Sequence, residues 1–60
     1  MSKKETLEKL RSVKLAMARK YENLARVAKS RAKRQQFLYH AARYHRQAQE
    51  VAARARSAAQ

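Results

Sequence analysis

The chain has 60 residues, of which 16 are lysine or arginine and 4 are acidic, so its formal net charge is +12. This length allows one domain, residues 1–60, near the lower limit at which burial of apolar surface offsets the entropy of ordering a backbone. The absence of cysteine excludes disulfides and thiolate metal sites, and no apolar run approaches the ~20 residues that span a bilayer, so we expect a cytoplasmic protein.

Helix is predicted from the N-terminus onward, because glycine and proline are absent and the best helix-forming residues dominate. Ser2, followed three residues later by Glu5, has the form of a capping box, so the first helix should begin at Ser2 or Lys3. Apolar residues then recur at spacings of three and four, which places them on one helix face. The stripe that we expect to be buried comprises Leu7, Leu10, Val13, Met17, Tyr21, Leu24 and Val27 or Ala28.

A break is predicted in residues 29–36 (KSRAKRQQ), which contain no large apolar residue, and Ser30 is the expected N-cap of the second helix. A second stripe follows in a heptad register. It comprises Phe37, Leu38, Ala41, Tyr44, His45, Ala48, Val51, Ala52, Ala55, Ala58 and Ala59. On one continuous helix, at 100° per residue, the two stripes would point roughly 150° apart, so neither could cover the other.

The phase of the two stripes therefore predicts an all-α fold, a two-helix antiparallel hairpin with helices at about 2–29 and 32–59. Association of two hairpins as a homodimer, in a four-helix bundle, is compatible with this pattern because it would double the buried stripe. One long amphipathic helix is the alternative, since no turn residue marks the break.

The sequence offers no catalytic residues, cofactor site or metal site. Its four acidic residues are scattered glutamates, and without cysteine or aspartate they provide no nucleophile or acid/base pair. His40 and His45 would point about 140° apart on a helix, so they cannot bind one ion. His45 falls on the predicted buried stripe, with no acidic neighbour in the sequence. We expect a binding protein rather than an enzyme.

The distribution of charge predicts a polyanionic partner. Residues 23–49 contain no acidic residue, and cations crowd the predicted turn. Phosphates are the expected ligands, because each neutralised phosphate releases condensed counterions and arginine, which outnumbers lysine, grips phosphate with two parallel hydrogen bonds. Tyr39, one turn before Arg43, could stack on an unpaired base. The candidate nucleic-acid-binding residues are Arg26, Lys29, Arg31, Lys33, Arg34, Tyr39, Arg43 and Arg46.

We therefore expect a small basic helical nucleic-acid-binding protein that associates with RNA or a ribonucleoprotein rather than with duplex DNA. Duplex recognition remains an alternative, because the second helix is predicted to display Gln36, Arg43, Arg46 and Gln47 on one face. A cationic membrane-active peptide is a further alternative, and the alanine-rich second stripe and the absence of tryptophan argue against such a membrane partner. The last alternative is a structural adaptor or self-assembling coiled coil.

Overall fold

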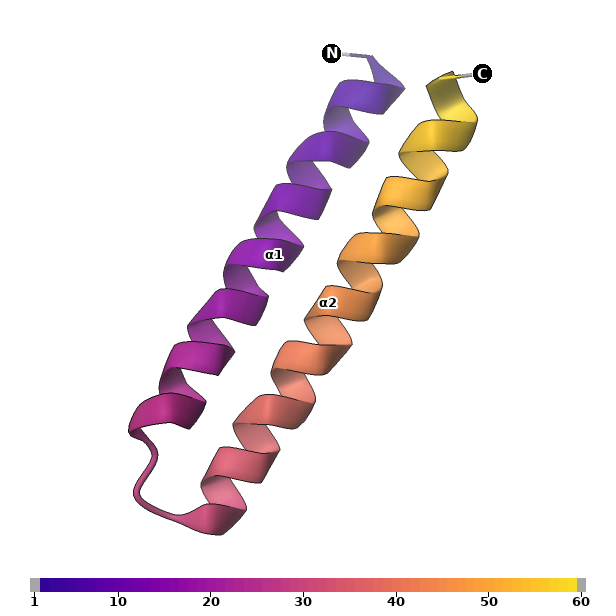
Figure 1. The fold of residues 1–60 in the computed structure, drawn as a ribbon. Helices are drawn as coiled ribbons and strands as arrows, with labels where there is room; N and C mark the ends of the chain where they lie inside the picture. The colour runs from indigo at the N-terminus through magenta and orange to yellow at the C-terminus, as the bar shows by residue number, and fades with distance from the viewer. Residues whose placement is uncertain (1, 60) are drawn as a thin grey trace.

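The computed structural model describes the backbone of residues 2–59 and the side chains of residues 2–57. Two helices, α1 (Lys3–Val27) and α2 (Arg31–Ala59), pack side by side in an antiparallel hairpin (Figure 1). The start of α1 and the end of α2 lie together at what we call the open end, and residues 28–30 connect the helices at the closed end. The hairpin prediction is confirmed, and the alternative of one long helix is wrong.

Both predicted N-caps are present, and each is a serine. Ser2 has an extended backbone, and its hydroxyl accepts a hydrogen bond from the backbone N–H of Glu5 at 3.2 Å. The Ser30 hydroxyl accepts in the same way from the N–H of Lys33 at 3.3 Å. Each cap satisfies a backbone donor that has no partner within its helix, which explains why the helices begin where they do.

Replacement of Ser30 by alanine should lower the free energy of unfolding by about 1 kcal/mol, because the hydrogen bond to Lys33 is lost. Denaturant unfolding followed by circular dichroism would measure the change. Ser12, which is exposed in the middle of α1, is the matched control, because alanine there should leave stability unchanged or raise it slightly. Equal behaviour of the two variants would show that the Ser30 cap does not stabilise α2.

The connection between the helices needs no glycine, because no described residue has a positive φ. Ala28 leaves α1 in an extended conformation (φ −68°, ψ 131°), and its N–H donates to the carbonyl of Ala25 at 3.3 Å. The Arg34 guanidinium donates to the carbonyl of Ala28 at 3.3 Å. An arginine from α2 thus hydrogen-bonds the backbone at the end of α1, where carbonyls lack partners within the helix.

The line of contact between the helices, here called the seam, is built mainly from alanine. The buried apolar residues among those described are Ala18, Ala25, Ala41, Ala48, Val51 and Ala55. The alanines recur every seven residues within each helix, which keeps them on one line, and their small side chains let the helices approach closely.

In the predicted second stripe, the buried residues are Ala41, Ala48, Val51 and Ala55, and the half-buried ones are Phe37, Tyr44 and Ala52. The prediction is wrong for Leu38, which is 50% exposed because it points about 60° away from Ala41 around the helix. The side chains of Ala58 and Ala59 lie outside the described residues.

The predicted stripe of α1 is only partly correct. Leu10, Val13 and Val27 are 40%, 57% and 72% exposed, whereas Met17 and Leu24 are half-buried at one margin of the seam. A helix presents one line to its partner, and in α1 that line carries Ala18 and Ala25. The close approach of two helices through alanine moves the larger residues to the flank, so their size was a misleading guide to burial.

Half-buried aromatic side chains flank the seam in the half of the hairpin nearer the closed end. The ring of Tyr21 in α1 stacks on Tyr44, with centroids 5.7 Å apart and planes 10° apart. It also lies 5.2 Å from the His40 ring and 6.2 Å from the Phe37 ring. The ammonium of Lys14 lies 5.6 Å from the centroid of Tyr44, a cation–π contact that accommodates a charge beside the seam.

Candidate nucleic-acid interface

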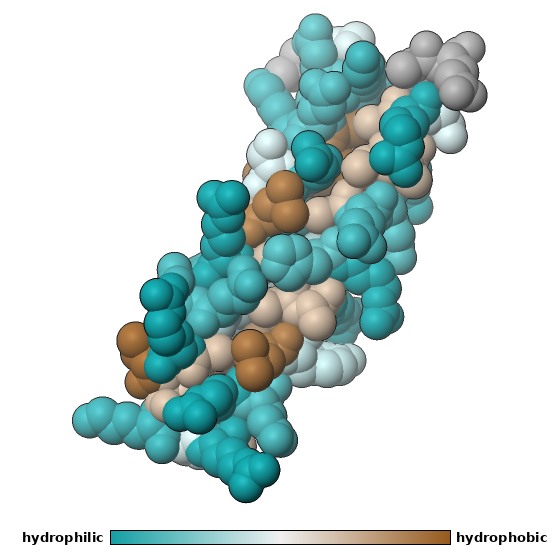
Figure 2. All heavy atoms as spheres, viewed as in Figure 1, coloured by the Kyte–Doolittle hydropathy of each residue, from teal (hydrophilic) through white to brown (hydrophobic). Residues whose placement is uncertain are grey.

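Five of the predicted binding residues gather at the closed end, and we call them the turn cluster. They are Arg26, Lys29, Arg31, Lys33 and Arg34. The first comes from the last turn of α1, the second from the connection and the other three from the first turn of α2. All five are exposed, and Figure 2 shows hydrophilic residues covering this end of the hairpin. The fold therefore holds together the cations that the sequence places near the turn.

The side-chain contacts of the turn cluster involve neutral oxygens. The Arg26 guanidinium donates to the side-chain oxygen of Asn23, and Arg34 donates to the Ala28 carbonyl. Among the described residues, none of the five cations forms an ion pair with a carboxylate. Glu22 borders the same groove as Arg26 and Arg34, but its carboxylate is directed to His45. The positive charge of the cluster is thus left without an anionic partner from the described chain.

The remaining predicted site residues lie along the face of α2 that points away from α1. Tyr39, Arg43 and Arg46 are exposed and spaced by four and three residues, which places them on one stripe opposite the seam alanines Ala41 and Ala48. We call these three residues the outer stripe. From Arg34 to Arg46 the helix rises about 18 Å at 1.5 Å per residue, so the turn cluster and the outer stripe follow one another along α2.

The second-helix face suggested for duplex DNA is only partly correct. Gln36 is exposed beside the outer stripe as predicted, but Gln47 is half-buried, and its side-chain oxygen is buried without a hydrogen-bond partner among the described residues. Gln47 follows Arg46 by one residue, which turns it by about 100° toward the margin of the seam. Gln47 is therefore not part of the candidate interface.

The prediction that His45 is buried is also wrong. Its side chain is 46% exposed, and its Nε2 atom lies 3.4 Å from the Oε1 atom of Glu22, a residue of the other helix. Because Glu22 is 23 positions away in the sequence, only the packing of the hairpin makes it an acidic neighbour. The half-buried histidine is His40, which lies against Tyr21. No group of three potential metal ligands occurs among the described residues.

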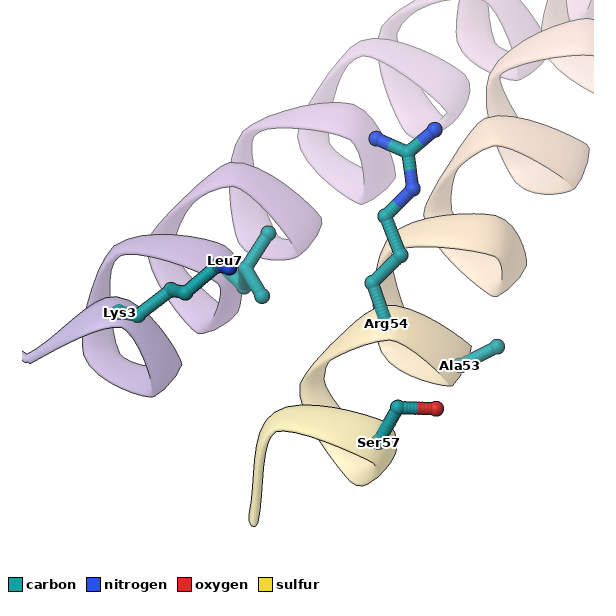
Figure 3. Close-up of a pocket in the computed structure, with 5 residues that line it drawn as sticks. All are labelled: Lys3, Leu7, Ala53, Arg54 and Ser57. Atoms are coloured by element: carbon teal, nitrogen blue, oxygen red, sulfur yellow. The ribbon is translucent and has the colours of Figure 1, made fainter. Parts of the chain in front are cut away.

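The open end carries a basic groove that sequence reasoning missed. It has a volume of about 650 Å³ and is lined by Lys3 and Leu7 from α1 and by Ala53, Arg54 and Ser57 from α2. In Figure 3, Leu7 points toward α2 and Arg54 extends along the space between the helices. Lys3 and Arg54 are 51 positions apart, so the only available signal was that a hairpin brings the two ends of the chain together.

The neighbouring grooves at the open end mix charges. Arg11 and Arg56 line a groove of about 550 Å³, and both also line an adjoining groove together with Lys4 and Glu8. The carboxylate of Glu8 lowers the positive potential there, because opposite charges within a few ångströms partly cancel. The two ends of the hairpin are both basic, but the turn cluster is the one whose five cations come from a stretch of sequence without acid.

Within residues 2–59, neither helix combines the length and the apolar composition that a membrane span requires. Comparison of the chain with protein-family models, with curated proteins and with solved structures finds no match in any of the three.

Proposed function

We propose that this protein binds nucleic acid, RNA or a ribonucleoprotein in preference to duplex DNA, through the turn cluster and the outer stripe of α2. The observation that carries the proposal is the grouping of five exposed cations at the closed end without an ion-pair partner among the described residues. A cytoplasmic location and a binding role rather than a catalytic one belong to the same proposal.

Electrostatic repulsion among the cations of the turn cluster favours the binding of an anionic partner. The chain carries a net charge of +12, and the fold brings cations from both helices to one end. The first turn of α2 contains no acidic residue that would offset these cations. A polyanion would relieve the repulsion and gain free energy by releasing its condensed counterions.

The shape and composition of the surface favour a phosphate backbone over a compact anion. From Arg31 to Arg46, at 1.5 Å per residue, the turn cluster and the outer stripe extend about 22 Å along α2, which is long enough to contact several successive phosphates of one strand. Arg43 and Arg46 continue the positive charge beyond the cluster. Guanidinium groups bind phosphate through two parallel hydrogen bonds and also stack on bases, which favours nucleic acid.

The proposal is tested by replacing Lys29, Arg31 and Lys33 together with glutamine and titrating RNA and DNA at several salt concentrations. We expect the affinity to fall at least about tenfold at low salt, and the slope of log K against log salt to flatten by about two to three units. Arg34 is kept, because its bond to the Ala28 carbonyl also supports the turn. Circular dichroism should show unchanged helicity.

The matched control replaces three exposed cations of the open end, Lys3, Lys4 and Arg56, with glutamine. This variant loses the same charge, but we expect a loss of affinity several-fold smaller, because Glu8 already weakens the field at that end. Equal losses in the two variants would show diffuse attraction without a defined site. The absence of binding to any nucleic acid at low salt would refute the proposal.

A second candidate function rests on the exposed apolar residues of α1. Leu10, Val13 and Val27 are exposed on α1 and could support a self-assembling coiled coil or adaptor. Sedimentation without nucleic acid distinguishes this function, because self-assembly requires a defined oligomer that Val13→Lys disrupts. Binding to anionic vesicles in place of RNA would instead favour a membrane-active peptide.

A further inference from the structure

Tyr39 is an aromatic side chain on the solvent face of α2, where burial does not account for it. It is 63% exposed, although it lies one residue from the half-buried His40. Helices of small soluble proteins usually carry charged or polar residues on such a face. An exposed aromatic ring within a basic surface is a typical contact for a base of a nucleic acid.

The Tyr39 ring is connected to the aromatic residues beside the seam through the ring of His40. The Tyr39 ring packs edge to face with His40, with centroids 5.8 Å apart and planes 69° apart. His40 in turn lies 5.2 Å from Tyr21, which is stacked on Tyr44. A series of rings thus runs from the aromatic residues beside the seam to Tyr39. The Tyr39 ring thus contacts the protein through His40, and its large exposed area remains available to a ligand.

The surroundings of Tyr39 on α2 suit a nucleotide chain. Arg43 lies one turn further along the helix and Arg46 two turns further, on the same stripe. Ala42, also exposed and one turn away, adds no bulk that would hinder a base from approaching the ring. No acidic residue occurs between positions 23 and 49, and Glu50, one turn beyond Arg46 on the same stripe, marks the end of the surface that can bind phosphate.

We infer that Tyr39 stacks on an unpaired base of a single-stranded nucleic acid whose phosphates bind Arg43 and Arg46. The inference rests on the proposed function and narrows its ligand class. In a duplex both faces of each base are covered by neighbouring base pairs, so a side-chain ring stacks readily only on an unpaired base. The strand continues along α2 toward the turn cluster, where further phosphates bind.

The experiment compares Tyr39→Ala, Tyr39→Phe and the control Leu38→Ala in binding to a uridylate RNA, a deoxyuridylate DNA and an RNA duplex of equal length. Leu38 is the matched control because it is the adjacent residue and is also half exposed, at 50%. We expect Tyr39→Ala to weaken single-strand binding about tenfold or more, as loss of one base stack predicts. Tyr39→Phe and Leu38→Ala should bind within about twofold of wild type, because the former retains the ring and the latter lies off the stripe.

Two readouts separate stacking from charge. The salt dependence of Tyr39→Ala should equal that of the wild type, because no cation is removed. Its affinity for the RNA duplex should change less than about twofold. Comparison of the affinities for the RNA and DNA single strands shows which of the two is the preferred ligand. Tighter binding of RNA would indicate a contact to the 2′-hydroxyl.

Tyr39→Ala binding single strands as tightly as the wild type, or losing duplex and single-strand affinity equally, would overturn the inference while the proposed function stands. Failure of the wild type to bind either form at low salt would refute the proposed function itself. A loss with Leu38→Ala equal to that with Tyr39→Ala would show a general effect on α2, which also contradicts a stacking role.

Discussion

Replacement of Ala48 by leucine is expected to unfold the hairpin. Ala48 is 2% exposed and lies in the middle of the seam, where the helices meet through methyl groups. A larger side chain must force the helices apart, and overpacking of this kind costs about 3 kcal/mol at the upper end of its usual range. A single core in a domain this small rarely supplies more than about 3 to 5 kcal/mol, so most of the stability would be lost.

Denaturant unfolding followed by circular dichroism measures the Ala48 effect, with Ala42→Leu as the control. Ala42 is exposed on the same helix, so the same substitution there adds identical atoms without entering the seam. We expect Ala42→Leu to unfold like the wild type. If Ala48→Leu also unfolded like the wild type, the alanine seam would not be the contact that holds the helices together.

Truncation of Tyr21 to alanine is the second large effect that we expect, with a loss of about 2 to 3 kcal/mol. Tyr21 contacts the rings of Phe37, His40 and Tyr44, and it is the residue of α1 on which these three α2 residues converge. Complete burial of such a ring would predict a larger loss, but Tyr21 is half-buried. Each aromatic pair contributes about 0.5 to 1.5 kcal/mol beyond burial, so the three contacts account for much of the effect.

The control for Tyr21→Ala is Tyr39→Ala, which removes the same atoms from the solvent face. Because Tyr39 is 63% exposed, its truncation should change the free energy of unfolding by less than about 1 kcal/mol. Thermal unfolding of both variants measures the difference. Similar melting of the two variants would show that the aromatic residues beside the seam do not stabilise the hairpin, and it would remove Tyr39→Ala as a clean probe of binding.

Local sequence determined the helices, their caps and the position of the turn. Ser2 and Ser30 cap the helices because each hydroxyl oxygen can accept a hydrogen bond from the free backbone N–H three residues later. This geometry is set within one turn of the helix. The break followed from the opposed phase of two apolar stripes, a property of the chain that needs no tertiary information. The turn cluster was predictable for the same reason, since its residues lie close together in the sequence.

Tertiary packing decided which residues of α1 face α2 and which pairs meet across the helices. The seam runs through Ala18 and Ala25 because close approach favours small side chains, and it leaves Leu10 and Val13 exposed although they are the stronger apolar signals. A helix can rotate about its axis by tens of degrees without changing its backbone hydrogen bonds, so periodicity alone does not set that rotation.

The rotation of each helix and the register between them also decide which residues meet across the hairpin, which could not be predicted from the sequence. Glu22 contacts His45, 23 positions away, and Lys3 and Arg54 line one groove at the open end. These pairs depend on the register of one helix against the other, which is set by the packing of alanines and aromatic rings along the whole seam. The sequence by itself therefore determined a basic helical hairpin and its turn cluster, whereas the buried face, the partner of His45 and the basic open end were decided only when the two helices packed.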